Sequence, residues 1–137
     1  MVNFDTLHQA QAPCVTAPDG AQVQVLLALR GGSMAAFTLQ PGQTSAAVSH
    51  RSVEELWFVL QGKGEMWRRD ATREDIVTLQ PGLCLSIPLG TSFQFRCTGD
   101  APLSAVAVTL PRWPGDGEAV VETGPWPPTC PVSAPRA

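Results

Sequence analysis

Short apolar runs, separated by glycine, proline and aspartate, make up most of this sequence. Few of them repeat with the period of about 3.6 residues that marks an amphipathic helix. They are instead four to eight residues long, either alternating or continuously apolar, as strands of packed sheets are. We predict eight strands, at Gln22–Ala28, Ser33–Leu39, Glu55–Gln61, Gly64–Arg69, Ile76–Leu79, Leu83–Ile87, Ser92–Cys97 and Ser104–Leu110. Their near-regular spacing predicts an all-β, antiparallel sandwich or barrel.

Two kinds of turn separate the predicted strands. Leu39–Gly42 and Leu79–Gly82 both read Leu-Gln-Pro-Gly, and each Pro-Gly pair predicts a turn that leads into a new strand. Two similar halves of this kind are typical of a double-sheet jelly roll. Gln61–Gly64 reads Gln-Gly-Lys-Gly, which predicts a tight hairpin between two neighbouring strands.

The composition changes after Leu110. Seven of the 13 prolines and two of the four tryptophans, Trp113 and Trp126, lie beyond it. Proline at this density disfavours helix and sheet interiors, so we expect an extended tail whose tryptophans pack on the barrel wall or on a neighbouring subunit. The last residues, 129–137, are expected to be mobile. The predicted division is residues 1–20 as an N-terminal segment, 21–112 as a barrel and 113–137 as a Pro/Trp-rich tail.

Size and charge narrow the class of protein. A chain of 137 residues with 44% hydrophobic and 15% charged residues is expected to form one packed domain. A net charge of −3 without a Lys/Arg run argues against nucleic acid as a partner. No apolar stretch approaches the roughly 18 residues of a membrane span, and the N-terminus lacks a signal-peptide layout, so we expect a cytoplasmic protein with no membrane partner. The four cysteines are expected to be reduced in that compartment, although a Cys84–Cys97 disulfide remains an alternative.

Two stretches carry a more specific signal. The first runs from Gly42 through Val48, His50 and Glu55 to Gly62, and the second runs from Gly82 through Pro88 and Gly90 to Phe93. Their spacing resembles the two motifs of the cupin superfamily, G(x)5HxH(x)3–4E(x)6G and G(x)5PxG(x)2H(x)3N. Every motif glycine and the motif proline coincide. The resemblance covers roughly residues 20–112 and implies a double-stranded β-helix, or jelly-roll barrel, whose open mouth holds the ligand.

The resemblance also implies a metal held by three histidines and one glutamate in many members, and here this chain departs from it. Only His50 and Glu55 occupy ligand positions, whereas Val48 and Phe93 stand where two of the histidines would be. The chain has one other histidine, His8, which we expect on the surface. Since such metals normally take at least three protein ligands, we expect no tightly bound cofactor and at most a weak divalent metal at His50 and Glu55.

Strand alternation assigns the side chains around this site. Val48 and His50 share a face, and Glu55, with the spacing that the motif requires, points inward while Glu54 is solvated. Trp57, Val59 and Gln61 should then share the inward side, and Leu56, Phe58 and Leu60 the outward side. The predicted ligand pocket is Val48, His50, Glu55, Trp57, Phe93 and Phe95, with Met34, Ala36 and Met66 as further wall residues.

The residues leave several functions open. The preferred hypothesis is a single-domain cupin that binds a small organic molecule in an aromatic-lined barrel without a complete metal site. One alternative is an isomerase, epimerase or cyclase in which His50 and Glu55 are the catalytic acid–base pair. The other is a metal-dependent dioxygenase or isomerase with a reduced ligand set. In every case we expect a homodimer, because Leu56, Phe58 and Leu60 form an outward apolar patch.

Overall fold

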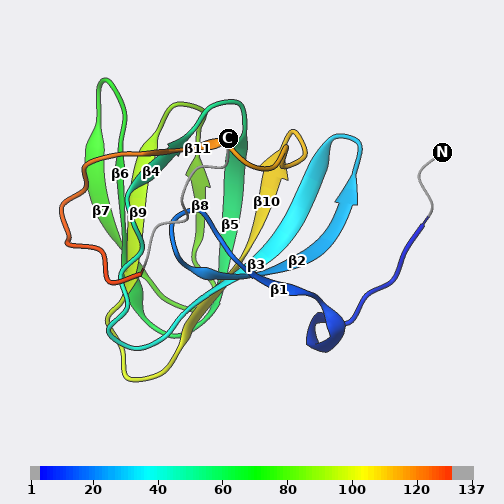
Figure 1. Ribbon diagram of the computed structural model, residues 1–137. Coiled ribbons are helices and arrows are strands. Elements are labelled where there is room, and N and C mark those ends of the chain that lie inside the picture. The colour runs from blue at the N-terminus through cyan, green and yellow to red at the C-terminus, as the bar shows by residue number, and fades with distance from the viewer. Residues whose placement is uncertain (1–3, 131–137) are drawn as a thin grey trace.

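The computed structural model of this protein describes residues 4–130, and these residues form two β-sheets packed face to face (Figure 1). A single turn of 3-10 helix, η1 (Gln9–Gln11), precedes the sheets. The strands are β1 (Cys14–Thr16), β2 (Gln22–Leu29), β3 (Gly32–Leu39), β4 (Val48–His50), β5 (Glu54–Gln61), β6 (Gly64–Arg69), β7 (Glu74–Leu79), β8 (Cys84–Ile87), β9 (Ser92–Cys97), β10 (Leu103–Leu110) and β11 (Ala119–Val121).

The two sheets have the strand orders β1-β2-β3-β10-β5-β8 and β11-β4-β9-β6-β7. Every neighbouring pair within them is antiparallel. The chain crosses repeatedly from one sheet to the other, as a jelly roll requires. The predicted all-β, antiparallel double-stranded β-helix is therefore confirmed.

All eight predicted strands are present, with ends that differ by at most two residues. Three further strands, β1, β4 and β11, have only three residues each and carry no alternation long enough to predict. β1 extends the six-stranded sheet and β11 extends the five-stranded sheet. Each segment that flanks the barrel therefore adds a strand to it, and the division at residues 20 and 112 stays a prediction.

The predicted hairpin at Gln61–Gly64 was wrong. β5 and β6 are joined by the two residues between them but belong to different sheets, so they do not pair. Gly62 has φ +85°, and a Cβ atom there would lie 2.4 Å from the carbonyl oxygen of Pro102. This close approach to the loop before β10 requires glycine, and it turns the chain from one sheet into the other.

The two Leu-Gln-Pro-Gly segments form the same turn. The backbone amide of Gln43 donates to the Gln40 carbonyl at 3.0 Å, and that of Leu83 donates to the Gln80 carbonyl at 3.1 Å. Gly42 and Gly82 both have positive φ, which a type II turn requires at its third residue. The repeated Leu-Gln-Pro-Gly sequence therefore corresponds to a repeated backbone conformation.

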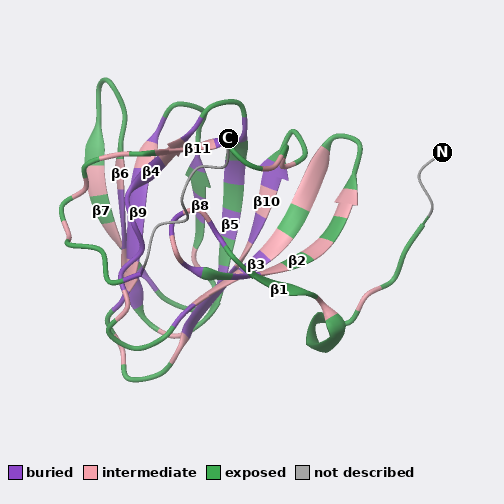
Figure 2. Ribbon diagram, in the orientation of Figure 1, coloured by how far each residue is buried: buried purple, intermediate pink, exposed green. Residues whose placement is uncertain are grey.

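The core lies between the sheets, and β5 shows its pattern clearly (Figure 2). Glu55, Trp57 and Val59 are buried, whereas Glu54 and the outward residues are exposed. Gln61 is exposed rather than inward, because the register between β5 and β10 shifts at a bulge just before it. Strand alternation holds up to that bulge and fails beyond it.

The proline-rich tail packs on the outer face of the five-stranded sheet, as one of the two predicted arrangements requires. The Gln94 amide donates to the Trp126 carbonyl at 2.8 Å, and its oxygen accepts from the Trp126 backbone amide at 3.2 Å. The Arg96 guanidinium stacks on the Trp126 ring at 4.1 Å. Thr129 and Cys130 hydrogen-bond to Thr44, so this end of the tail is held, and the rest of the expected mobile stretch lies outside the described residues.

All four cysteines are free thiols, so the alternative of a Cys84–Cys97 disulfide is not realised here. Within residues 4–130 no helix is both long and apolar enough to cross a membrane.

Candidate functional site

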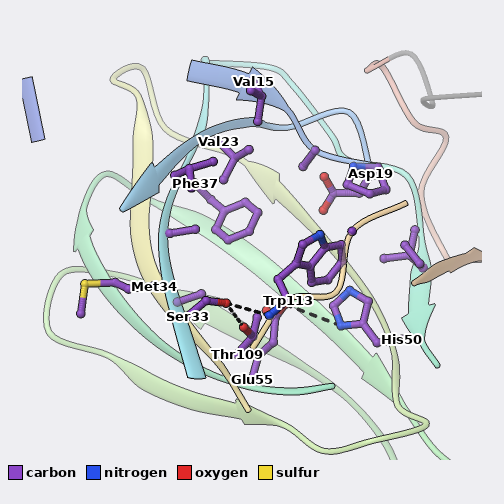
Figure 3. A pocket seen from close by; sticks show the side chains of 18 of the residues that line it. Val15, Asp19, Val23, Ser33, Met34, Phe37, His50, Glu55, Thr109 and Trp113 are labelled. Carbon is purple, nitrogen blue, oxygen red and sulfur yellow. Dashed lines mark hydrogen bonds and ion pairs between the residues drawn. The ribbon is translucent and has the colours of Figure 1, made fainter. Parts of the chain in front are cut away.

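A cavity of about 500 Å³ lies between the two sheets, and Figure 3 shows side chains that line it. Its wall is mainly apolar and aromatic, with a group of polar side chains from the strands and Asp19 from the loop between β1 and β2. Its lining includes Asp19, Ser33, Ala35, Phe37, Val48, His50, Glu55, Trp57, Phe93, Ala107, Thr109 and Trp113.

Strand register places Glu55 at the base of this cavity. Thr109 of β10 is the partner of both Glu55 on β5 and Ser33 on β3, so the three side chains form one polar row across the sheet. The Ser33 and Thr109 hydroxyls are joined by a short hydrogen bond. Glu55 is only 3% exposed, and it is therefore a carboxyl group held in a largely dry environment.

The next row explains why there is an open space. Ala107 is the partner of both Trp57 and Ala35, so the large indole stands beside two methyl groups. Phe37, one row further along, stacks on Trp57 with ring centroids 5.1 Å apart and an interplanar angle of 15°. Small residues on the inner face leave volume, and the flat aromatic pair lines it.

β4 supplies the opposite wall. Val48 and Phe93 are direct cross-strand partners, and both are 2% exposed. His50 lies on the same face as Val48, and its ring meets the Phe93 ring edge-on at 5.3 Å. Ser49 points away and donates to the Glu122 carboxylate at 2.9 Å, as alternation predicts. The two apolar residues at former ligand positions therefore face each other beside His50.

Trp113 closes the site from the C-terminal segment, and sequence reasoning missed its role. Its backbone amide donates to the Ser33 hydroxyl at 2.9 Å, and its ring packs edge-on against His50 at 5.2 Å. β11 pairs with β4 directly after it, with Ala119 opposite His50. The signal in the sequence was a tryptophan in a proline-rich segment. It predicted that the side chain packs against the barrel or a neighbouring subunit, but not that it lies beside His50.

The segment that carries Trp113 is fixed by Glu118. This buried carboxylate accepts hydrogen bonds from the backbone amides of Ser52 and Val53 at 2.7 and 2.9 Å, and from the Ser52 hydroxyl at 2.6 Å. Arg51 donates to the Gly117 carbonyl at 2.8 Å. The turn between His50 and Glu55 is thereby tied to the segment that follows Trp113.

His50 and Glu55 lie together without a hydrogen bond between them. His50 Nδ1 is 3.6 Å from Glu55 Oε1, while Glu55 Oε2 accepts from the Trp57 indole N–H at 2.6 Å. Among the buried side-chain nitrogen and oxygen atoms of residues 4–130, only His50 Nδ1 has no partner. An unsatisfied buried polar atom is costly, and at the wall of a cavity it is available to a ligand.

Burial shifts the titration of these groups away from their charged forms. It lowers the pKa of His50 to about 4, against a smaller opposing effect of the Glu118 charge. It raises the pKa of Glu55 to about 7, although the Trp57 hydrogen bond acts in the other direction. Between these values the site presents a neutral imidazole beside a protonated carboxyl group.

Five of the six predicted pocket residues border the cavity: Val48, His50, Glu55, Trp57 and Phe93. Phe95 is a correction, because it lies behind Trp57, with the rings 5.1 Å apart, and is not among the lining residues. Of the further wall residues, Met34 is at the rim and 41% exposed. Ala36 and Met66 do not line the cavity, since the pairing of β3 with β10 turns Ala35 inward and Met66 is part of the packed core.

The donor set does not fit the metal that the resemblance implies. Val48 and Phe93 offer no donor atom, and His8 lies in the exposed segment beside η1, where its imidazole caps that turn. No group of three or more His, Cys, Asp or Glu side chains in the described part of the chain could hold a metal ion. A site with His50 and Glu55 alone is short of the three protein ligands that first-row metals normally take. The weak divalent site stays a prediction.

Comparison with known proteins agrees with this fold. No curated protein is similar enough in sequence to count as a relative. A crystal structure of a predicted oxalate decarboxylase from Thermotoga maritima is 17% identical, with 78% of this chain and 99% of that chain covered and a TM-score of 0.66. KdgF from a Halomonas species is 14% identical, with coverage of 80% and 96% and a TM-score of 0.67.

An uncharacterised protein with a double-stranded β-helix domain from Klebsiella pneumoniae is 16% identical, with coverage of 89% and 100% and a TM-score of 0.69. Other matching chains are longer, and this chain spans only 30% of a Bacillus subtilis oxalate decarboxylase. At these identities the likeness concerns the fold alone. A family model described as the cupin domain matches residues 35–109, more than half of the sequence. The chain therefore belongs to the cupin family.

Proposed function

We propose that this cupin binds a small organic molecule, with an aromatic or other apolar body, in the cavity between its sheets. The observation that carries the proposal is a cavity of about 500 Å³ with aromatic walls and buried polar side chains, among them Asp19, His50 and Glu55. Such a volume lies within the range of about 300–1,000 Å³ typical of small-molecule sites. Phe37 and Trp57 offer a stacked pair of rings, and Phe93 and Trp113 offer further ring faces and edges.

The polar base supports a defined orientation for the guest. His50 Nδ1 has no partner, so it can accept from a hydroxyl or N–H of the molecule or, in the other tautomer, donate to one of its oxygens. Glu55 lies next to it with one oxygen already engaged by Trp57. A bound molecule would match both parts of the cavity if its polar end lay at His50 and Glu55 and its apolar body lay along the aromatic wall.

Calorimetry and thermal shift with a panel of aromatic alcohols, acids, amines and sugars test this proposal. A ligand present at a hundred times its dissociation constant should stabilise the protein by about 2.7 kcal/mol. Ala35→Phe fills the space beside Trp57 and should abolish binding, whereas Ala71→Phe, at an exposed turn outside the cavity, should not. A panel without any binder, or equal binding to both variants, would contradict the proposal.

A second candidate function, proton transfer, is favoured by the His50–Glu55 pair. A neutral imidazole and a carboxyl group with a pKa near 7 are 3.6 Å apart at the wall of a cavity, where one can accept and the other donate a proton near neutral pH. An isomerase, epimerase or cyclase needs no more than such a pair. If a substrate is found, His50→Ala should reduce its turnover at least about 100-fold, and unchanged turnover would eliminate this candidate.

We also propose a homodimer formed through the outer face of the six-stranded sheet. The tail packs over β9 on the outer face of the other sheet, whereas Leu56, Phe58 and Leu60 are 53, 46 and 43% exposed. Val106 and Val108 of β10 are the register partners of Phe58 and Leu56, so the apolar side chains form one continuous surface. A second copy of the same surface is the partner that matches it in chemistry.

A further inference from the structure

A second buried carboxylate, Asp19, lies in the cavity wall together with Glu55. It belongs to the loop between β1 and β2 and is 5% exposed. Its Oδ1 accepts from the Ala21 backbone amide at 3.0 Å, and its carbonyl accepts from the Ala46 amide at 2.8 Å. Figure 3 shows its carboxylate directed toward the space beside Phe37 and Trp113. Its position is therefore fixed, and its second oxygen is not used by any of these bonds.

The charged side chains around the cavity are unbalanced. Asp19 and Glu55 are both buried, and they are close enough to each other for the charge of Asp19 to contribute to the raised pKa of Glu55. Among the lining residues within 4–130, the one cationic side chain is Arg112, which is exposed at the rim, as is Asp116. Glu118, the remaining acid near His50, is engaged by the amides of Ser52 and Val53. The interior thus holds two carboxyl groups and no fixed cation.

The other walls suit a cation as well. Ring faces attract ammonium groups through their quadrupole, and Phe37, Trp57, Phe93 and Trp113 surround the same space. His50 Nδ1, in a side chain that is 6% exposed, has no partner among the described residues, and it is an acceptor when the neutral imidazole carries its proton on Nε2. Carboxylates, aromatic ring faces and an unpaired hydrogen-bond acceptor all bind ammonium groups. None of them favours an anionic group.

We infer that the molecule bound here is an organic cation, a protonated amine on an apolar or aromatic body, whose ammonium group lies between Asp19, Glu55 and His50 Nδ1. This inference rests on the proposed function, since it names the class of ligand for the same cavity. It places small carboxylates at a disadvantage, because they would add a third negative charge without a cation to pair with. It also gives Asp19 a role beyond its turn, as the group that selects for charge.

Titration of Asp19 gives the inference a signature of its own. Burial raises the pKa of Asp19 to about 6, with its hydrogen bond to the Ala21 amide acting in the opposite direction. An ammonium group favours the charged form of Asp19, so its binding should release protons near pH 6. Affinity for an amine should therefore rise as the pH increases from 5.5 to 8, and Asp19→Asn should reduce this rise. The pKa of His50 is lowered to about 4 and that of Glu118 is also lowered, so the charge of neither group changes over this range.

Calorimetry with three probes of the same body tests this directly: 2-phenylethylamine, 2-phenylethanol and phenylacetate. We expect the amine to bind about tenfold or more tightly than the alcohol at pH 7.5, with phenylacetate the weakest. Asp19→Asn keeps the acceptor for the Ala21 amide, so the fold should survive, and it should lower affinity for the amine alone. Asp100→Asn removes the same charge from an exposed loop outside the cavity and serves as the control.

The outcomes separate the two proposals. If the alcohol or phenylacetate binds as tightly as the amine, or if Asp19→Asn weakens amine and alcohol equally, the ligand class is wrong while the cavity remains a binding site. If none of the three probes binds, the proposed function fails and this inference fails with it. Should Asp19→Asn not fold, the ranking of probes and the proton release of the wild-type protein decide the matter alone.

Discussion

His50 Nδ1 and Glu55 Oε1 lie 3.6 Å apart, and the carboxyl group instead accepts a hydrogen bond from the Trp57 indole N–H. Because both groups are buried, both prefer their uncharged forms, and the pKa of His50 moves to about 4 while that of Glu55 moves to about 7. A neutral pair with an unused acceptor atom is a poor ion pair and a suitable recognition element. The pH dependence of stability follows from the same two shifts.

Replacement of Glu55 by glutamine should remove a pH-dependent destabilisation. Between its ordinary pKa of 4.5 and about 7, Glu55 binds more protons in the folded than in the unfolded protein, so stability falls as the pH rises through this window. At about 1.4 kcal/mol per pKa unit, the effect is about 3 kcal/mol. We therefore expect the free energy of unfolding of Glu55→Gln, measured by urea titration, to increase relative to that of the wild type by up to this amount between pH 4.5 and 8.

Two features keep this test specific. Glutamine retains an oxygen for the Trp57 indole, and Glu54→Gln provides the matched control at the exposed neighbouring position. His50 acts in the opposite direction, since its lowered pKa makes stability fall as the pH drops from 6.5 toward 4, but it is present in all three proteins. Parallel stability curves for Glu55→Gln and the wild type would show that Glu55 is not buried as a neutral acid.

Trp113 and Trp126 offer a matched pair of truncations. Trp113→Ala removes the ring that packs on His50 and should weaken binding of 2-phenylethanol about tenfold, because part of the aromatic wall is lost. Trp126→Ala removes a ring outside the cavity, under Arg96, and should lower the melting temperature without changing affinity. Calorimetry and thermal unfolding of both variants are the measurements. Equal affinity in Trp113→Ala and the wild type would remove Trp113 from the site.

The outer face of the six-stranded sheet should form the dimer contact. Light scattering at micromolar concentration should give about twice the chain mass of 14.6 kDa for the wild type. Phe58→Glu places a charge in the centre of the apolar surface and should give a monomer. Ile76→Glu, at a similarly exposed position on β7 of the other sheet, should remain dimeric. A monomeric wild type at this concentration would rule out the dimer.

Restoring the missing donors should create a metal site. Val48 and Phe93 face each other across β4 and β9 beside His50, so Val48→His with Phe93→His would bring three imidazoles and Glu55 together. We expect this double variant to bind Zn²⁺ or Ni²⁺ far more tightly than the wild type, although loss of the Phe93 packing should lower its melting temperature. Calorimetry with the metal salts checks this. Unchanged metal affinity would show that the wall residues are not what excludes the ion.

The sequence was sufficient for eight of the eleven strands and for much of the site. Glycine spacing distinguished Glu55 from Glu54, and alternation correctly turned Leu56 and Phe58 outward. These features depend on local periodicity, which the chain carries at every position of a strand. The choice of the strands that pair with β5 does not depend on local periodicity. The short connection at Gly62 links two sheets instead of forming a hairpin, and its sequence alone does not distinguish these two cases.

The walls were less predictable because they depend on register and on segments without periodicity. Ala36 was expected to face the cavity, but pairing with β10 makes Ala35 and Phe37 the inward residues. Asp19 lies in a Pro-Asp-Gly turn, where an aspartate is common for local reasons. Its sequence context therefore gave no indication that it lines the cavity. Trp113 is held beside His50 by its backbone hydrogen bond to Ser33 and by the pairing of β11 with β4, and three residues are too few to predict that strand.

The most direct test of the central idea, that this cavity receives an organic molecule and not a metal ion, is the metal content of protein purified without a histidine tag or chelator. Elemental analysis should find iron, manganese, nickel and zinc far below one ion per chain, and added metal should not change the melting temperature. Close to one ion per chain, lost on His50→Ala, would contradict the proposal that two donors beside Val48 and Phe93 leave the site to a carbon-based ligand.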